Sequence, residues 1–233
     1  MSGLVLSCFP GAGLLDQAFS DAGYTVVRGP DALFGGDIRH EHYPRGVFVG
    51  LIGGPPCPVF STASALHGGG AVDLVPEFVR VFHETQPEFV VMENVPPARK
   101  LAKTPSEWFC TILRDWDCGG LTYRRRAFWT WPFMVPLPGK RPGTPEHSVM
   151  ASTAKRGRSD NPFLAAKGYL AGDLPIAEYA RLQGVPEIGA ALEAAQAGRR
   201  FAVRVLGNGV PLALGSHVAR AALSWQQQME AAS

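Results

Sequence analysis

Residues 51–61 constrain the fold most, because an apolar run stops there at Gly-Gly-Pro-Pro and a cysteine follows at once. Residues 47–52 have the length and apolarity of a buried strand. Open parallel sheets bind ligands at the carboxyl ends of their strands, and prolines on both sides of Cys57 stiffen its loop. Cys57 is therefore a candidate nucleophile, although this segment alone is equally compatible with a small apolar cysteine in a turn.

A strand, a glycine turn and a helix are predicted near the N-terminus. Residues 4–8 are apolar, Phe9-Pro10-Gly11-Ala12-Gly13 interrupts the run, and apolar residues recur at helical spacing from Leu14 to Ala22. Glycines let a ligand approach the backbone, and the first N–H groups of a helix attract a negative group. A tight turn between strand and helix also needs glycine, so the turn alone identifies no ligand.

Two aspartates follow the next predicted strand, residues 24–28. Asp31 is a candidate acceptor for the hydroxyls of a ribose, and Asp37 is a second candidate, for an adenine amino group. Each is about equally compatible with an ordinary turn residue. Residues 31–36 are too short and too rich in glycine for a crossover helix, so the chain departs here from a plain βαβ repeat.

A carboxylate follows another predicted strand, residues 88–92, which ends at Glu93 and Asn94. This places Glu93 in the same layer as Cys57, where the two can serve as proton donor and nucleophile. The remaining elements are predicted as a helix that begins after Asp73, a helix that ends with residues 109–113, two paired strands at 119–123 and 127–131, and helices at 176–183, 190–197 and 210–226.

Composition describes a globular chain of 233 residues, 46% hydrophobic and 18% charged, long enough to bury a full core. No apolar run approaches the roughly 20 residues of a membrane span, and no signal peptide is evident, so we expect a soluble intracellular protein. The four cysteines, Cys8, Cys57, Cys110 and Cys118, have neither metal-ligand nor disulfide spacing. Two basic clusters, 124–126 and 155–158, are by themselves typical of solvated surface.

Seven short segments occur in the order typical of the cytosine-C5 DNA methyltransferases, and over nearly its whole length the chain resembles that family. The segments are Phe9-Pro10-Gly11-Ala12-Gly13, Gly36-Asp37-Ile38, Pro55-Pro56-Cys57, Glu93-Asn94-Val95, Arg124-Arg125-Arg126, residues 178–186 and Gly207-Asn208-Gly209-Val210-Pro211. The resemblance implies a doubly wound α/β sheet that binds S-adenosylmethionine and methylates C5 of a cytosine rotated out of duplex DNA.

The same resemblance implies a role for each matched position. Catalysis would fall to Cys57, Glu93, Arg124 and Arg126, with Cys57 adding to C6 of the base. Cofactor contacts are expected from Phe9, Gly11, Ala12, Gly13, Leu14, Asp31, Asp37, Ile38, Pro55, Asn208 and Val210. DNA contacts are expected from Ser61, Asn94, Arg156 and Arg158, within a region whose scattered basic residues suit phosphate contacts. The resemblance implies no metal.

The region between the predicted strand at 127–131 and the predicted helix at 176–183 has only about forty residues, where the family normally inserts a sizeable target-recognition domain. Together with the missing crossover helix after Asp31, this points to a compact member, like the small enzymes carried by bacterial viruses. Three single positions also depart from the family pattern. Pro58 stands where the family usually has glutamine, Thr122 where its arginine motif usually begins with glutamine, and Ser7 where aspartate often precedes the cofactor loop. We expect a catalytic and cofactor-binding core at 1–131, a reduced target-recognition region at 132–173, and C-terminal helices at 174–233 that complete the core.

Two alternatives to DNA methylation stay open. One is methylation of cytosine in RNA, although the cysteine–phenylalanine–threonine signature of that family branch is absent from the sequence. The other is a catalytically silent protein that binds S-adenosylmethionine or DNA, which Pro58 keeps open and the presence of both Cys57 and Glu93 opposes. The expected partner is double-stranded DNA, with no membrane, in the cytoplasm of a bacterial or phage-infected cell, and the expected state is a monomer.

Overall fold

A six-stranded sheet runs through the residues that the computed structural model describes, which are 3–56, 72–148 and 174–232. The strands are β1 (Leu4–Cys8), β2 (Thr25–Arg28), β3 (Gly50–Gly53), β4 (Phe89–Asn94), β5 (Phe109–Arg114) and β6 (Arg125–Trp131). Their order across the sheet is β2-β1-β3-β4-β6-β5, with β1 to β4 parallel and β6 antiparallel to both of its neighbours.

The strand order reverses at β1, because β2 lies on one side of it and β3 on the other. Such a reversal leaves a crevice at the carboxyl ends of the strands, where ligands bind in open α/β sheets. The doubly wound α/β fold predicted from the sequence is therefore confirmed. In place of a crossover helix, two short 3-10 turns, η1 (Ala32–Phe34) and η2 (Ile38–His40), link β2 to β3.

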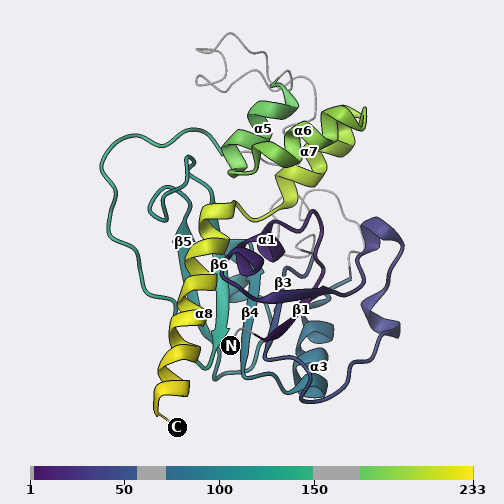
Figure 1. Ribbon diagram of the computed structural model, residues 1–233, viewed down its shortest axis with the longest axis vertical. Helices are drawn as coiled ribbons and strands as arrows, with labels where there is room; N and C mark the ends of the chain where they lie inside the picture. The colour runs from purple at the N-terminus through teal and green to yellow at the C-terminus, as the bar shows by residue number, and fades with distance from the viewer. Residues whose placement is uncertain (1–2, 57–71, 149–173, 233) are drawn as a thin grey trace.

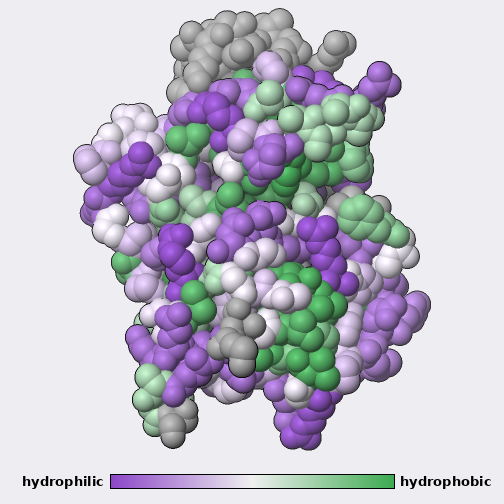
Figure 2. Space-filling model, in the orientation of Figure 1, coloured by the Kyte–Doolittle hydropathy of each residue, from purple (hydrophilic) through white to green (hydrophobic). Residues whose placement is uncertain are grey.

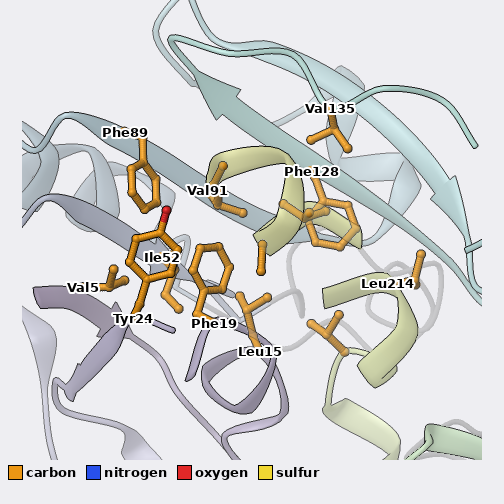
Figure 3. Packing of buried hydrophobic residues seen from close by; sticks show 14 of the residues in the cluster. Val5, Leu15, Phe19, Tyr24, Ile52, Phe89, Val91, Phe128, Val135 and Leu214 are labelled. Carbon is orange, nitrogen blue, oxygen red and sulfur yellow. The ribbon is translucent and has the colours of Figure 1, made fainter. Parts of the chain in front are cut away.

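Helices cover both faces of the sheet (Figure 1). α1 (Leu14–Asp21) and α8 (Leu212–Ala232) pack on one face and α3 (Val75–Thr85) on the other. Alternate residues of β4 separate accordingly, since Phe89 joins one apolar cluster and Val90 the other, as the two-residue period of a strand requires. In the first cluster the rings of Phe19, Tyr24 and Phe89 lie together, with centroids 5.6 to 6.2 Å apart (Figure 3).

Three helices form a second layer above the carboxyl ends of the strands (Figure 1): α5 (Ile176–Gln183), α6 (Pro186–Ala194) and α7 (Arg199–Asn208). Their shared apolar cluster includes Tyr179, Val203 and Leu206, and it reaches Leu14 at the start of α1. α5 has the predicted bounds, α6 begins four residues before the predicted helix at 190–197, and α7 was not predicted. This second layer covers the crevice at the strand reversal.

Two sequence predictions in the middle of the chain are wrong. The predicted helix end at 109–113 is strand β5, because this short apolar run pairs with β6 at the edge of the sheet. The predicted strand at 119–123 is not a strand, because within it only Thr122 makes a bridge, an isolated one with Glu146. The carboxylate of Asp115 accepts hydrogen bonds from the backbone N–H of Leu121 at 3.2 Å and of Thr122 at 2.9 Å.

Most of the surface seen in Figure 2 is hydrophilic, with hydrophobic groups over α6 and α7 and over the sheet near β1. The upper group fits the alanine-rich sequence of α6. Among residues 3–56, 72–148 and 174–232, no helix combines the length and apolarity needed to cross a bilayer.

Candidate active site

A cavity of about 590 Å³ opens at the carboxyl ends of β1, β3 and β4 and is closed on one side by α7. Its volume lies within the range of roughly 300 to 1,000 Å³ that is typical of small-molecule sites. The glycine turn after β1 forms one wall, and Gly53 to Pro56 and Glu93 to Val95 form another. Of the predicted cofactor residues, Phe9, Gly11, Ala12, Leu14, Asp31, Pro55, Asn208 and Val210 line it.

The glycine turn is held in left-handed backbone conformations. Phe9 has φ 57°, Gly11 has φ 52° and Gly13 has φ 76°. For Phe9 this conformation is strained, and it ends the strand abruptly where the cavity begins. A Cβ atom on Gly11 would meet nothing within 4 Å, so its backbone faces open space in the cavity wall.

Asp31 ties the end of β2 to this turn, because its Oδ2 accepts a hydrogen bond from Gly11 N at 2.8 Å. Asp37 and Ile38 lie elsewhere. Neither lines the cavity: the carboxylate of Asp37 pairs with Arg39 (2.6 Å between Oδ2 and Nη2), and Ile38 is buried under α3. Hydrogen bonds from Arg39 lower the pKa of Asp37. The cofactor contacts expected of Asp37 and Ile38 stay predictions.

A buried acid that the sequence did not single out lies in the cavity wall. Asp16 is 2% exposed, accepts a hydrogen bond from Ser7 Oγ at 2.5 Å, and pairs with Arg28 at 2.7 Å between Oδ2 and Nε. Burial raises the pKa of Asp16, while Ser7 and Arg28 act in the opposite direction. The signal in the sequence was an acidic residue on the otherwise apolar face of a helix.

The Arg28 side chain crosses Gly13. A Cβ atom on Gly13 would collide with Nη2 of Arg28, so the absence of a side chain at Gly13 makes room for the guanidinium. Gly13 is thus required both by its positive φ and by Arg28.

The segment before Cys57 is fixed to the end of β4. Asn94 donates from Nδ2 to the carbonyl oxygen of Pro55 at 3.1 Å, and its Oδ1 accepts from Val95 N at 2.8 Å. A Cβ atom on Gly54 would lie 3.0 Å from Oε2 of Glu93, so the two strand ends approach closely. The predicted residues Cys57, Ser61, Arg156 and Arg158 lie outside the described residues.

Glu93 and Arg126 form a buried ion pair in the cavity. Oε1 of Glu93 lies 2.5 Å from Nε of Arg126, and their side chains are 10% and 13% exposed. Burial raises the pKa of Glu93, which Arg126 and Arg124 partly oppose. Glu93 therefore keeps a proton to higher pH than an ordinary glutamate, as a proton donor requires.

Arg124 is buried and does not line the cavity. Its Nη2 donates to the carbonyl oxygens of Gly207 at 2.5 Å and Gly209 at 3.4 Å. Gln183 adds hydrogen bonds from Nε2 to the carbonyls of Leu206 and Gly209. Both side chains fix the turn that follows α7; the catalytic role expected of Arg124 stays a prediction.

One face of α7 supplies cavity residues that the sequence did not indicate. Phe201, Arg204, Val205 and Asn208 all line the cavity, at the three- and four-residue spacing of one helical stripe. Only Asn208 was predicted. The others lacked a signal because α7 itself was not predicted from the sequence.

Several further predicted features can be placed. Among the described cysteines, Cys8 is buried in the core, and burial raises the pKa of its thiol to about 12. No group of three potential metal ligands occurs within the described ranges. In the described part of the predicted recognition region, 132–148, the Arg141 guanidinium stacks over the ring of Trp116, 3.9 Å from its centroid.

Part of the chain is similar in sequence to known proteins. Residues 35–123 match the model of the family described as C-5 cytosine-specific DNA methylase. The type II methyltransferase M.FnuDI of Fusobacterium nucleatum is 31% identical over 136 residues, which are 50% of this chain and 38% of that protein. The matched part thus spans less than half the length of that relative.

Solved methyltransferase structures share the fold. The Dnmt2 methyltransferase of S. pombe superposes with a TM-score of 0.62 at 13% identity, covering 96% of this chain and 99% of that one. A protein assigned as a DNA modification methyltransferase, encoded within a prophage of E. coli, gives a TM-score of 0.59 at 16% identity, covering 96% of this chain and 99% of that one. At these identities the likeness concerns the fold alone.

Proposed function

We propose that this chain, of which residues 35–123 match the C-5 cytosine-specific DNA methylase family, transfers a methyl group from S-adenosylmethionine to C5 of cytosine in duplex DNA. One observation carries the proposal: the buried Glu93–Arg126 pair and the glycine turn of residues 9–13 line the same cavity. Proton donation and cofactor binding are therefore possible within one site, as a methyl transfer between two bound molecules requires.

The cavity fits the cofactor. Phe9, Leu14 and Val210 offer apolar contacts, Asp31 offers a carboxylate near the glycine turn, and the open backbone at Gly11 allows close approach. These residues would hold the nucleoside and amino-acid parts of S-adenosylmethionine. When bound, it supplies an electrophilic methyl group on sulfur.

The chain's own residues would activate the base. Cytosine C5 is a weak nucleophile, and addition of the Cys57 thiolate to C6 would raise the electron density at C5. Glu93 would donate its proton to N3 as the C6–sulfur bond forms, which neutralises the charge that develops on the ring. Arg126 would hold Glu93 and the O2 edge of the base. After methylation, loss of the C5 proton to a base would release Cys57 by elimination.

DNA would enter from the open side of the cavity. C6 of a paired cytosine is inaccessible within the helix, so the target base would rotate out, at a cost of roughly a few kcal/mol. Ser61, Asn94, Arg156 and Arg158 are the proposed DNA contacts, with 132–173 as a reduced recognition region. Asn94 also holds Pro55, so its contribution would include positioning of the nucleophile segment.

The test is mass spectrometry of nucleosides after incubation of cytosine-containing duplex DNA, or transfer RNA, with the protein and isotopically labelled S-adenosylmethionine. We expect labelled 5-methylcytosine in DNA from the wild type and from the control variant Cys110→Ala, but none from Cys57→Ala. Labelled 5-methylcytosine in transfer RNA but not in DNA would favour the alternative that the protein methylates cytosine in RNA. Absence of product despite cofactor binding would favour the silent binding protein.

A further inference from the structure

Arg204 lines the cavity, and no described carboxylate pairs with its guanidinium. Five charged side chains line the cavity within the described residues: Asp16, Asp31, Glu93, Arg126 and Arg204. Asp16 pairs with Arg28, Glu93 pairs with Arg126, and Asp31 accepts from Gly11 N. Arg204 makes no hydrogen bond or ion pair with any residue that the structure describes. An anion that enters the cavity thus finds in Arg204 a cation that pairs with none of the described carboxylates.

The packing of α7 fixes on which face of the helix Arg204 lies. Val203 and Leu206, on one face of the helix, are fully buried against α5 in the cluster that contains Tyr179. Arg204 therefore lies on the stripe with Phe201 and Asn208, which faces the cavity.

Both ends of α7 are held. Arg199 donates from Nη1 to the carbonyl of Leu174 at 2.9 Å at its start, and Arg124 and Gln183 hold the carbonyls at its end. The end of α7 also approaches α1, since a Cβ atom on Gly209 would lie 2.8 Å from Cδ2 of Leu14 (Figure 1). These contacts fix α7, and with it Arg204, in the wall of the cavity that the glycine turn also lines.

We propose that Arg204 binds the carboxylate of the amino-acid part of the cofactor. The inference rests on the proposed function, because it requires S-adenosylmethionine in this cavity. An α-amino-acid carboxylate is the chemical match for a guanidinium fork, and none of the described acids of the wall pairs with Arg204. The nucleoside part has no carboxylate, so Arg204 contributes to binding only where the amino-acid part is present.

The test measures binding of two ligands by calorimetry in the absence of DNA. S-adenosylhomocysteine carries the carboxylate, whereas 5′-methylthioadenosine lacks the entire amino-acid part. We expect Arg204→Ala to weaken the binding of S-adenosylhomocysteine about 10- to 100-fold, the usual range for a charged hydrogen-bonded pair. Binding of 5′-methylthioadenosine should stay within about twofold. Arg204→Lys should recover part of the loss.

Arg200→Ala is the matched control, because Arg200 lies on α7 but does not line the cavity. It should bind both ligands as the wild type does. Unchanged S-adenosylhomocysteine affinity in Arg204→Ala would overturn the proposal, as would equal losses for both ligands, which would indicate a distorted cavity. If Arg204→Ala bound S-adenosylhomocysteine normally but bound DNA more weakly and with less dependence on salt, Arg204 would contact a DNA phosphate. That result would also overturn the proposal. Failure of the wild type to bind S-adenosylhomocysteine would refute the proposed function itself.

Discussion

Asp16 and Arg28 meet across Gly13, with 2.7 Å between Oδ2 and Nε, and so fasten the glycine turn between α1 and β2. The two partners differ in burial, since the side chain of Asp16 is 3% exposed and that of Arg28 is 59% exposed. Removal of Arg28 would leave a buried carboxylate without its cationic partner, with Ser7 as its remaining side-chain partner among the described residues, and this is costlier than loss of an exposed ion pair.

We therefore expect Arg28→Ala to lower the free energy of unfolding by about 1 kcal/mol. Arg28→Ala should also weaken the binding of S-adenosylhomocysteine several-fold, because the turn at Gly13 loses the ion pair that holds it. Urea titration and calorimetry measure the two effects. Arg45→Ala, at an exposed site outside the cavity, is the control. If the two variants behave alike, the pair does not support the turn.

The pair of Glu93 with Arg126 predicts a specific pH dependence. Burial raises the folded-state pKa of Glu93 above its ordinary value of 4.5. The folded state then binds the proton more tightly, so the stability from Glu93 is complete below about pH 4.5 and is lost as pH rises through the folded pKa.

Compared with Glu93→Gln, the wild type should therefore lose stability as pH rises above about 4.5, by at most about 1.4 kcal/mol per pH unit. Urea titrations of both proteins from pH 4 to pH 8 give this difference, and subtraction removes the effects of other acids. A difference that grows in favour of the wild type with rising pH would contradict a raised pKa. Methyl transfer by Glu93→Gln should fall by a factor of at least about 100.

Asn94 should affect turnover more than cofactor binding, because it holds the carbonyl of Pro55 just before the proposed nucleophile. For Asn94→Ala we expect a 10- to 100-fold lower kcat, by analogy with other misplaced catalytic groups, and a stability loss of about 1 to 2 kcal/mol. S-adenosylhomocysteine affinity should stay within about threefold.

Single-turnover methylation with calorimetry separates these effects. Gln17→Ala is the control, since the side chain of the exposed Gln17 bonds only to Asp21 among the described residues. A variant of Asn94 with normal turnover would show that Pro55 needs no such support.

Arg124 should behave as a positioning residue for the turn after α7. Its removal leaves the carbonyl of Gly207 without this buried donor, so we expect Arg124→Ala to cost about 2 to 3 kcal/mol and Arg124→Lys to recover little of it. Arg125→Ala, at an exposed neighbouring site, should stay within about 0.5 kcal/mol. Thermal and urea unfolding measure both. Equal stability of the two alanine variants would refute the positioning role.

The local pattern of the sequence predicted β1, the start of α1, the bounds of α5 and the strand ends that carry Gly53 and Glu93. These features follow from the spacing of apolar residues and from the positions of glycine and proline, because both determine the backbone conformation over only a few residues. The ordered motifs likewise indicated the family. The sequence alone therefore placed the proposed nucleophile and acid after neighbouring strands.

Features that depend on residues far apart in the sequence were decided by the tertiary structure. Residues 109–113 become a strand because β6 offers an edge, since a short apolar run does not itself choose between helix and strand. Asp16 becomes a buried charge because Ser7 and Arg28, 9 and 12 residues away, converge on it. The stripe of α7 with Arg204 faces the cavity because Val203 and Leu206 pack on α5. Packing and desolvation act between segments that meet only in the folded chain, so the order of residues alone does not reveal them.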